Sequence, residues 1–167
     1  PQKEMERLHP ALVVDFPEEC NVMNALAAEG LTPDDVDYLI FTHLHWDHCY
    51  NGEKFPGKTF YVQKTEVMYA LDPLDVHANI YESTKIGMTP PWFRIMSQLK
   101  IVDGDVEIDE GIKLIFTPGH SPGSQSVLIN TTDGPYLIAG DTIMQYENWE
   151  GKGNQKHLFS AAHVNLM

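Results

Sequence analysis

One short segment of the chain gathers side chains that can bind a metal ion. Residues 43–48 read His-Leu-His-Trp-Asp-His, which places three histidines and one aspartate in six positions. The segment directly follows the apolar run 36–41, which predicts a buried β-strand. A strand fixes the backbone and the turn after it spreads the side chains, so these groups are well placed around a cation. The segment therefore predicts a metal site at a strand end.

A second segment offers one more imidazole. The Gly/Pro-rich stretch 117–124 holds His120 directly after another predicted strand. Together with His43 and His45, this side chain would give three nitrogen ligands around one ion. That is the ligand number of an open zinc site, with one position left for water.

A second ion could be held by the remaining polar groups. Asp47 and His48 would point away from the first ion, and Asp141, at the end of a further predicted strand, could bridge the two. Imidazole with carboxylate suits zinc, manganese or iron. Two such ions lower the pKa of a shared water and polarise a carbonyl group. We therefore expect two zinc ions, with manganese or iron as alternatives, in a hydrolytic enzyme.

The other residues of these types lack such neighbours. For four histidines we expect ordinary surface or hydrogen-bonded positions: His9, His77, His157 and His163. Trp46 is expected to pack, and Cys49 to be a buried small apolar residue.

Composition limits the classes of partner. The chain has 167 residues, 43% of them hydrophobic, which is enough for a single domain, residues 1–167, with a sizeable core. The formal net charge is −13, with only 11 Lys and Arg residues. Nucleic acids and anionic membranes are bound largely through such cations, so we expect neither partner, and a small-molecule substrate instead. The sequence has no apolar run long enough to span a membrane.

The cysteine content favours a reducing compartment. Cys20 and Cys49 are the only two cysteines, and their positions do not suggest a disulfide framework. We therefore expect a cytoplasmic location.

Strands and helices alternate in the first part of the chain. The expected elements are a strand at 11–16, a helix over 22–27, the strand 36–41, a strand at 59–62 and a helix at 64–71. Three apolar runs follow, at 99–102, 106–108 and 112–116. Short Asp/Gly segments separate them, which predicts an antiparallel meander. A hairpin of 126–130 with 136–139 then leads to Asp141.

Residues 68–98 are predicted to form a mobile insert. The stretch is rich in aromatic residues, Met and Pro, and it lacks the period of a strand. It is either a loop that packs on its own domain or a lid over the site. Its apolar side chains could also serve a homodimer interface.

These motifs resemble those of a known family. Residues 43–48 resemble the H-x-H-x-D-H signature of the metallo-β-lactamase superfamily. The segment 117–123 and the pair Gly140-Asp141 resemble its next two motifs in the same order. The match spans about residues 11–145, and the sequence of its motifs is most similar to that of the N-acyl-homoserine lactonase-like branch.

The resemblance implies a fold and a ligand set. The fold would be an α/β structure, an αβ/βα four-layer sandwich, which we expect to be truncated at both ends. The implied ligands are His43, His45 and His120 on the first metal, Asp47 and His48 on the second, and Asp141 between them.

The sequence departs from the family pattern in two places. Members usually carry one more metal-binding histidine near the C-terminus, after a final strand, and this chain ends before any such strand. Either the chain is a fragment or its second metal site is incomplete. A lactonase tyrosine is expected three residues after the bridging aspartate, where this chain has Met144. Tyr146 is the remaining candidate for that catalytic role if the loop shifts.

The leading prediction is a metal-dependent hydrolase of an ester-like bond, a lactone or a thioester. A metal-activated hydroxide would attack, while Asp47 would orient it and pass a proton to the leaving group. One alternative is a glutathione-thioester hydrolase similar to glyoxalase II, which needs a basic patch, with Lys85 and Arg94 as candidates. The other is a non-catalytic metal-binding module.

Overall fold

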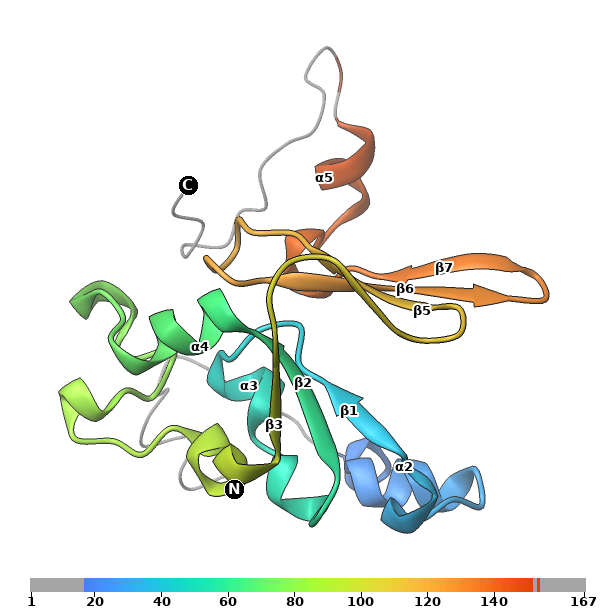
Figure 1. Cartoon of the computed structure of the whole chain (residues 1–167), viewed down its shortest axis with the longest axis horizontal. Coiled ribbons are helices and arrows are strands. Elements are labelled where there is room, and N and C mark those ends of the chain that lie inside the picture. Colours follow the sequence, from blue (N-terminus) through green and yellow to red (C-terminus); the bar gives the residue numbers. More distant parts are fainter. Residues whose placement is uncertain (1–16, 152, 154–167) are drawn as a thin grey trace.

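Two β-sheets form the framework of the molecule (Figure 1). The structure is a computed structural model that describes residues 17–151 and 153, so the strand expected at 11–16 lies outside the described residues. The first sheet is parallel and contains β1 (Tyr38–Ile40), β2 (Thr59–Gln63) and β3 (Leu99–Val102). The second is antiparallel and contains β4 (Val106–Asp109), β5 (Ile112–Phe116), β6 (Gln125–Thr131) and β7 (Gly134–Ile138).

Short helices connect the strands. The α-helices are α2 (Val22–Ala28), α3 (Trp46–Cys49), α4 (Lys64–Leu71) and α5 (Tyr146–Glu150). Single turns or short runs of 3-10 helix are η1 (Glu18–Cys20), η2 (Pro33–Asp35), η3 (Gly52–Lys54), η4 (Asp75–His77), η5 (Thr84–Ile86), η6 (Pro91–Gln98) and η7 (Gly140–Thr142). The predictions of a helix over 22–27 and of another at 64–71 are confirmed.

Strand β2 lies between two hydrophobic cores because its side chains alternate between the two faces of the sheet. Phe60 and Val62 are fully buried in the larger core, on the side of the helices. Tyr61 points the other way and packs with Leu114 and Val127 of the second sheet. Helices, the parallel sheet and the antiparallel sheet thus form three successive layers, and α5 lies beyond the second sheet (Figure 1). This is the layering expected of an αβ/βα sandwich.

The predicted meander over 99–116 is wrong in its first strand. β3 pairs in parallel with β2, while only β4 and β5 form an antiparallel pair. The segment 103–105 is a corner between the sheets instead of a hairpin turn. Gly104 has a φ of 83° there, and its N–H and C=O both bond to the side chain of Gln63. The predicted hairpin of 126–130 with 136–139 is confirmed as β6 and β7.

The segment predicted as an insert contributes to the larger core. Tyr81, Trp92 and Ile95 are each at most 1% exposed and belong to the same cluster as Phe60. The mobility of this segment and its role as a lid stay predictions.

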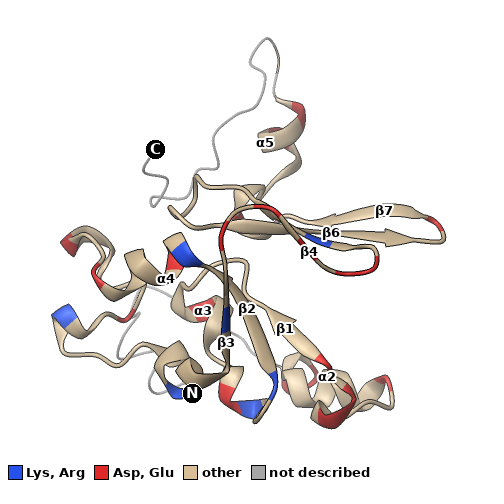
Figure 2. Ribbon diagram, viewed as in Figure 1, with Lys and Arg blue, Asp and Glu red and all other residues tan. Residues whose placement is uncertain are grey.

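Charged side chains are scattered over the described residues. In Figure 2 the few Lys and Arg residues are separated from one another along the ribbon. Several of them pair with acids: Lys64 with Asp103, Lys85 with Asp72, Arg94 with Glu53 and Lys113 with Asp105. None of the helices in the described part of the chain has the length and apolar character of a membrane span.

The packing between the sheets can be tested at Leu114, which is fully buried against Tyr61. Leu114→Ala is expected to lower the free energy of unfolding by about 2 to 5 kcal/mol, because it leaves a cavity between the sheets. Leu137→Ala on β7 is the matched control, since Leu137 is 47% exposed. Urea unfolding of both variants measures the difference, and equal losses would contradict this account of the core.

Candidate metal centre

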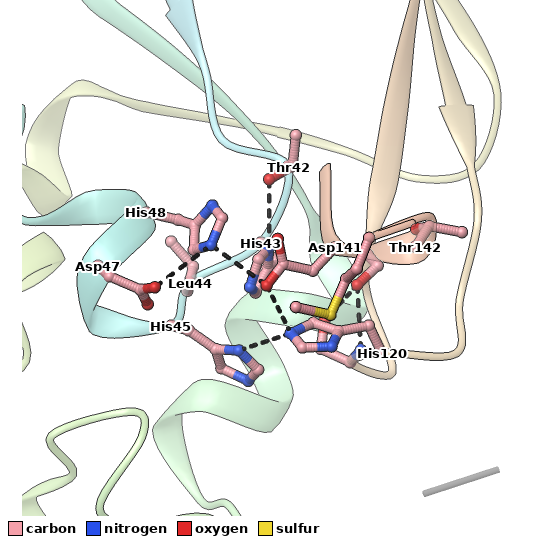
Figure 3. A network of polar contacts seen from close by, with 12 residues as sticks. Thr42, His43, Leu44, His45, Asp47, His48, His120, Asp141 and Thr142 are labelled. Atoms are coloured by element: carbon pink, nitrogen blue, oxygen red, sulfur yellow. Dashed lines mark hydrogen bonds and ion pairs between the residues drawn. The ribbon is translucent and has the colours of Figure 1, made fainter. Parts of the chain in front are cut away.

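The potential ligands come together where three strands end (Figure 3). His43 and His45 follow β1, His120 lies in the loop after β5, and Asp141 lies in η7 after β7. The carboxyl ends of β5 and β7 lie at the same edge of the second sheet, because both strands run antiparallel to β6. Two sheets therefore contribute to one cluster.

The first group consists of His43, His45 and His120, whose nearest potential ligand atoms lie within 4.8 Å of one another. All three side chains are buried. Nε2 of His120 lies 3.0 Å from Nδ1 of His45. Nε2 of His43 is buried without a hydrogen-bond partner, while its Nδ1 lies 3.1 Å from Oγ1 of Thr42. An unsatisfied buried nitrogen costs free energy, so this atom and its neighbours fit a cation.

The second group consists of His43, His48 and Asp141. Oδ2 of Asp141 lies 3.4 Å from Nε2 of His48 and 3.4 Å from Nε2 of His120. Figure 3 shows this carboxylate between the two imidazoles. Asp141 is thus placed between the two groups, where a bridging ligand would lie.

Two of the predicted site residues, Asp47 and Tyr146, do not belong to either group. Asp47 is at the margin: its Oδ2 lies 3.6 Å from Nε2 of His48, and half of its side chain is exposed. Asp47 lies in the first turn of the short helix α3. Tyr146 is not brought to the cluster, because it begins α5 and is 83% exposed. Its predicted catalytic role stays a prediction.

The surroundings set the charge of the imidazoles. Burial, together with the neighbouring imidazoles, lowers the pKa of His43 far below its ordinary value. Burial and His120 lower the pKa of His45 to about 2. Both rings are therefore neutral near pH 7, which is the form that binds metals.

The pKa values of His48 and Asp141 each shift in the direction that favours the charged form. Burial lowers the pKa of His48, but the hydrogen bond to Asp141 and the charges of Asp47 and Asp141 outweigh it, so the pKa is raised. The hydrogen bond from His48 lowers the pKa of Asp141. The two side chains lie in contact, with Nε2 of His48 3.4 Å from Oδ2 of Asp141.

A glycine allows two of the loops to meet. Gly140 has a φ of 55°, and a Cβ placed on it would lie 2.9 Å from Cβ of Thr42. The loop after β7 can therefore approach the loop after β1 only without a side chain at this position. This contact carries Asp141 towards His43.

The sequence analysis missed a buried carboxylate beneath the cluster. Glu66 in α4 is fully buried and accepts four hydrogen bonds, from Leu44, Tyr81, Ser121 and Gly123. Burial raises its pKa, although all four hydrogen bonds act to lower it. Leu44 and Ser121 are direct neighbours of predicted ligands.

It also missed a pair of buried amides. Nε2 of Gln63 donates to Oε1 of Gln125 at 2.8 Å, and Nε2 of Gln125 donates to the carbonyl of Phe41 at 2.7 Å. The pair links β2, β6 and the end of β1. The only sequence signal for this pair was that Gln63 and Gln125 are polar residues at strand positions that face inward.

Other predictions for single residues have mixed outcomes. Cys49 is 1% exposed, which confirms it as a buried residue. His77 is buried, and its Nδ1 lies 2.6 Å from the hydroxyl of Tyr69, which confirms a hydrogen-bonded histidine. The remaining three histidines without predicted roles lie outside the described residues.

Comparison with known proteins identifies the family. The sequence model of the metallo-beta-lactamase superfamily matches residues 5–162. The chain belongs to the metallo-beta-lactamase superfamily. This confirms the predicted family and fold class.

Similar superfamily members are lactonases. The chain is 37% identical over 134 residues to an N-acyl homoserine lactonase of Bacillus thuringiensis, covering 80% of this chain and 49% of that protein. It is 31% identical over 141 residues to the N-acyl homoserine lactonase AttM of Rhizobium radiobacter, covering 84% and 53%. The chain thus spans about half the length of the curated relatives it matches.

A solved structure of a lactone hydrolase is also similar to this chain. An N-acyl homoserine lactone hydrolase with the product N-hexanoyl-L-homoserine bound at its catalytic metal center superimposes with a TM-score of 0.65. The two sequences are 31% identical, and the match covers 87% of this chain and 54% of the other. The predicted resemblance to the N-acyl homoserine lactonase branch is confirmed by these relatives.

The histidine cluster predicts how stability depends on pH. The pKa values of His43, His45 and His77 are lowered in the folded state, so below about pH 6.5 the unfolded chain binds more protons there. The metal-free protein is therefore expected to lose stability as pH falls from 7.5 to 5.5. The raised pKa values of His48 and Glu66 oppose this loss, so two groups act against the three histidines whose pKa values are lowered.

The contribution of one ring can be isolated with His45→Gln. Each histidine that protonates only when unfolded contributes a slope of about 1.4 kcal/mol per pH unit. The variant should therefore show a slope that is shallower by up to that amount between pH 6 and 5.5. Urea unfolding of both metal-free proteins measures it, and equal slopes would contradict a buried neutral His45.

Proposed function

We propose that this chain carries the metal site of a hydrolase that opens the ester bond of a lactone. The observation that carries the proposal is the placement of Asp141 between His48 and His120, next to the buried histidine group. Two overlapping sets of ligands, with one carboxylate between them, suit a pair of metal ions. The lactonases at 37% and 31% identity support a lactone as the substrate.

Zinc is the proposed metal, with manganese or iron as alternatives. The donors are imidazole nitrogens and carboxylate oxygens, which suit all three. His43, His45 and His120 would hold the first ion, and His48 with Asp141 would hold the second, with Asp47 as an additional ligand. Ions bound there supply a water of lowered pKa and polarise the ester carbonyl.

Asp47 is the residue proposed to move a proton. Its carboxylate is half exposed and lies beside His48, so it can contact both the site and a bound substrate. It would accept a proton from the attacking water and return it to the alcohol that leaves when the ring opens. Its neighbour His48 would hold it in place through their contact of 3.6 Å.

A pocket beside these two residues suits an uncharged or acylated substrate. Its other walls include Val22, Leu39, Phe55 and Phe60. None of the described residues that line it is Lys or Arg. Apolar walls with a few polar groups at one end are typical of small-molecule sites.

The glutathione-thioester alternative is not favoured. Lys85 forms ion pairs with Asp72 and Asp75, and Arg94 pairs with Glu53. These were the two candidate cations for the carboxylates of glutathione, and both already face acids. The lactonase relatives point the same way.

The hydrolase proposal predicts activity that depends on His45. The wild-type chain is expected to bind two zinc ions and to hydrolyse N-acyl homoserine lactones faster than thioesters or β-lactams. His45→Ala should lose bound metal and most of this activity, while Asp37→Asn, an exposed residue before β1, should keep both. Metal analysis and a substrate panel measure this. Equal hydrolysis by wild type and His45→Ala would remove the metal mechanism, and metal binding without hydrolysis would favour the non-catalytic module.

A separate prediction concerns Asp47 as a proton carrier. Asp47→Asn is expected to lower kcat by about 10²- to 10⁴-fold, the range typical of general acid–base groups. KM should change little, because the apolar walls of the pocket are unchanged. Steady-state kinetics with equal metal loading check this, and a kcat equal to that of Asp37→Asn would exclude the role.

A further inference from the structure

We propose that Glu66 is a positioning residue that sets the spacing between the two segments that carry the histidine ligands. The inference rests on the proposed function, because it concerns the same metal site. Glu66 does not touch the ligand side chains. It acts through the backbone and side chains next to them.

The contacts of the carboxylate reach both segments. Oε1 accepts from the backbone N–H of Leu44 at 2.9 Å, and Leu44 lies between His43 and His45. Oε2 accepts from Oγ of Ser121 at 2.6 Å, directly after His120. One rigid group therefore connects the loop after β1 to the loop after β5.

Each oxygen also takes a second bond. Oε1 accepts from the hydroxyl of Tyr81 at 3.0 Å, and Oε2 from the N–H of Gly123 at 3.0 Å. The ring of Tyr81 lies 4.6 Å from the ring of His45, at an angle of 74°. Tyr81 thus links the carboxylate to a ligand from a third direction.

The chemistry requires a carboxylate at this position. Each of its oxygens faces one backbone N–H, from Leu44 on one side and Gly123 on the other, and a backbone N–H cannot rotate away. An amide has only one accepting atom, so a glutamine in either orientation would turn its NH₂ group towards one of these donors. A buried donor without an acceptor is costly, and the affected loop would move.

The loop after β5 also packs closely against α4. A Cβ placed on Gly123 would lie 2.1 Å from the backbone nitrogen of Glu66 and 2.3 Å from its Cα. The loop after β5 therefore rests directly on the start of α4. The position of His120 depends on this contact and on the carboxylate together.

The test compares Glu66→Gln with Glu110→Gln, a matched change at an exposed turn. Far-UV circular dichroism checks folding, and Co²⁺ and Zn²⁺ affinities are measured by competition with a chromophoric chelator. Glu66→Gln is expected to bind the first ion about 10- to 100-fold more weakly, the usual effect of removing a group that orients ligands. Its Co²⁺ absorption spectrum should also change. A folded variant with wild-type affinity and spectrum would overturn the proposal.

Two milder variants decide the matter if Glu66→Gln does not fold. Tyr81→Phe and Ser121→Ala each remove one donor and leave both backbone bonds. Weaker Co²⁺ binding in these folded variants supports the proposal, and wild-type affinity in both overturns it.

Hydrogen exchange separates this proposal from the proposed function. The amides of Leu44 and Gly123 should exchange slowly in the metal-free wild type and faster in whichever of these variants folds. Equal exchange rates in the wild type and the variants would overturn the proposal that Glu66 holds the two loops, whether or not the chain binds metal. A wild type that binds Co²⁺ but hydrolyses no lactone would contradict the proposed hydrolase function and leave the proposed role of Glu66 unaffected.

Discussion

A single buried carboxylate organises the part of the molecule in which the ligands meet. Glu66 lies beneath the cluster, and its hydrogen bonds reach partners that are 15 to 57 positions away in the sequence. Burying a polar group is unfavourable unless it is hydrogen-bonded, and here each oxygen has two donors. The loops can satisfy this group in only one arrangement, because two of the donors are fixed backbone N–H groups. The requirement to satisfy one side chain thus becomes a constraint on the position of the metal ligands.

The requirement that buried polar groups be hydrogen-bonded also applies between the two sheets. Gln63 and Gln125 are buried at the boundary of the parallel and antiparallel layers, and their amides bond to each other, to Gly104 and to Phe41. A register error in either sheet would leave several of these groups unpaired in a medium of low dielectric constant, so the network specifies how the sheets align. The hydrophobic contacts around Tyr61 and Leu114 are less selective, because apolar contacts have no preferred direction.

The clustering of the candidate ligands could be predicted from the sequence, because each of them follows the end of a predicted strand. Residues 43–48 lie in one segment after an apolar strand, and His120 and Asp141 each follow a strand end. Glu66 gave no such signal, since its partners Leu44 and Gly123 are 22 and 57 positions away. The sheet change at Gly104 was missed because a glycine with positive φ serves a hairpin turn and a corner equally well. The errors therefore concern tertiary contacts between segments that are far apart in the sequence.

The division of the ligands between two sheets gives a bound ion a structural effect as well as a chemical one. His43 and His45 follow the parallel sheet, and His120 and Asp141 follow the antiparallel sheet, so an ion would join the two layers at one edge. Any ligand that binds only the folded state stabilises it in proportion to the logarithm of its concentration over its dissociation constant. Since Glu66 already holds the two loops at the required spacing, little of the binding free energy is spent on ordering them. A tether that orders the site before the ion arrives therefore increases both the affinity for metal and the stability of the loaded fold.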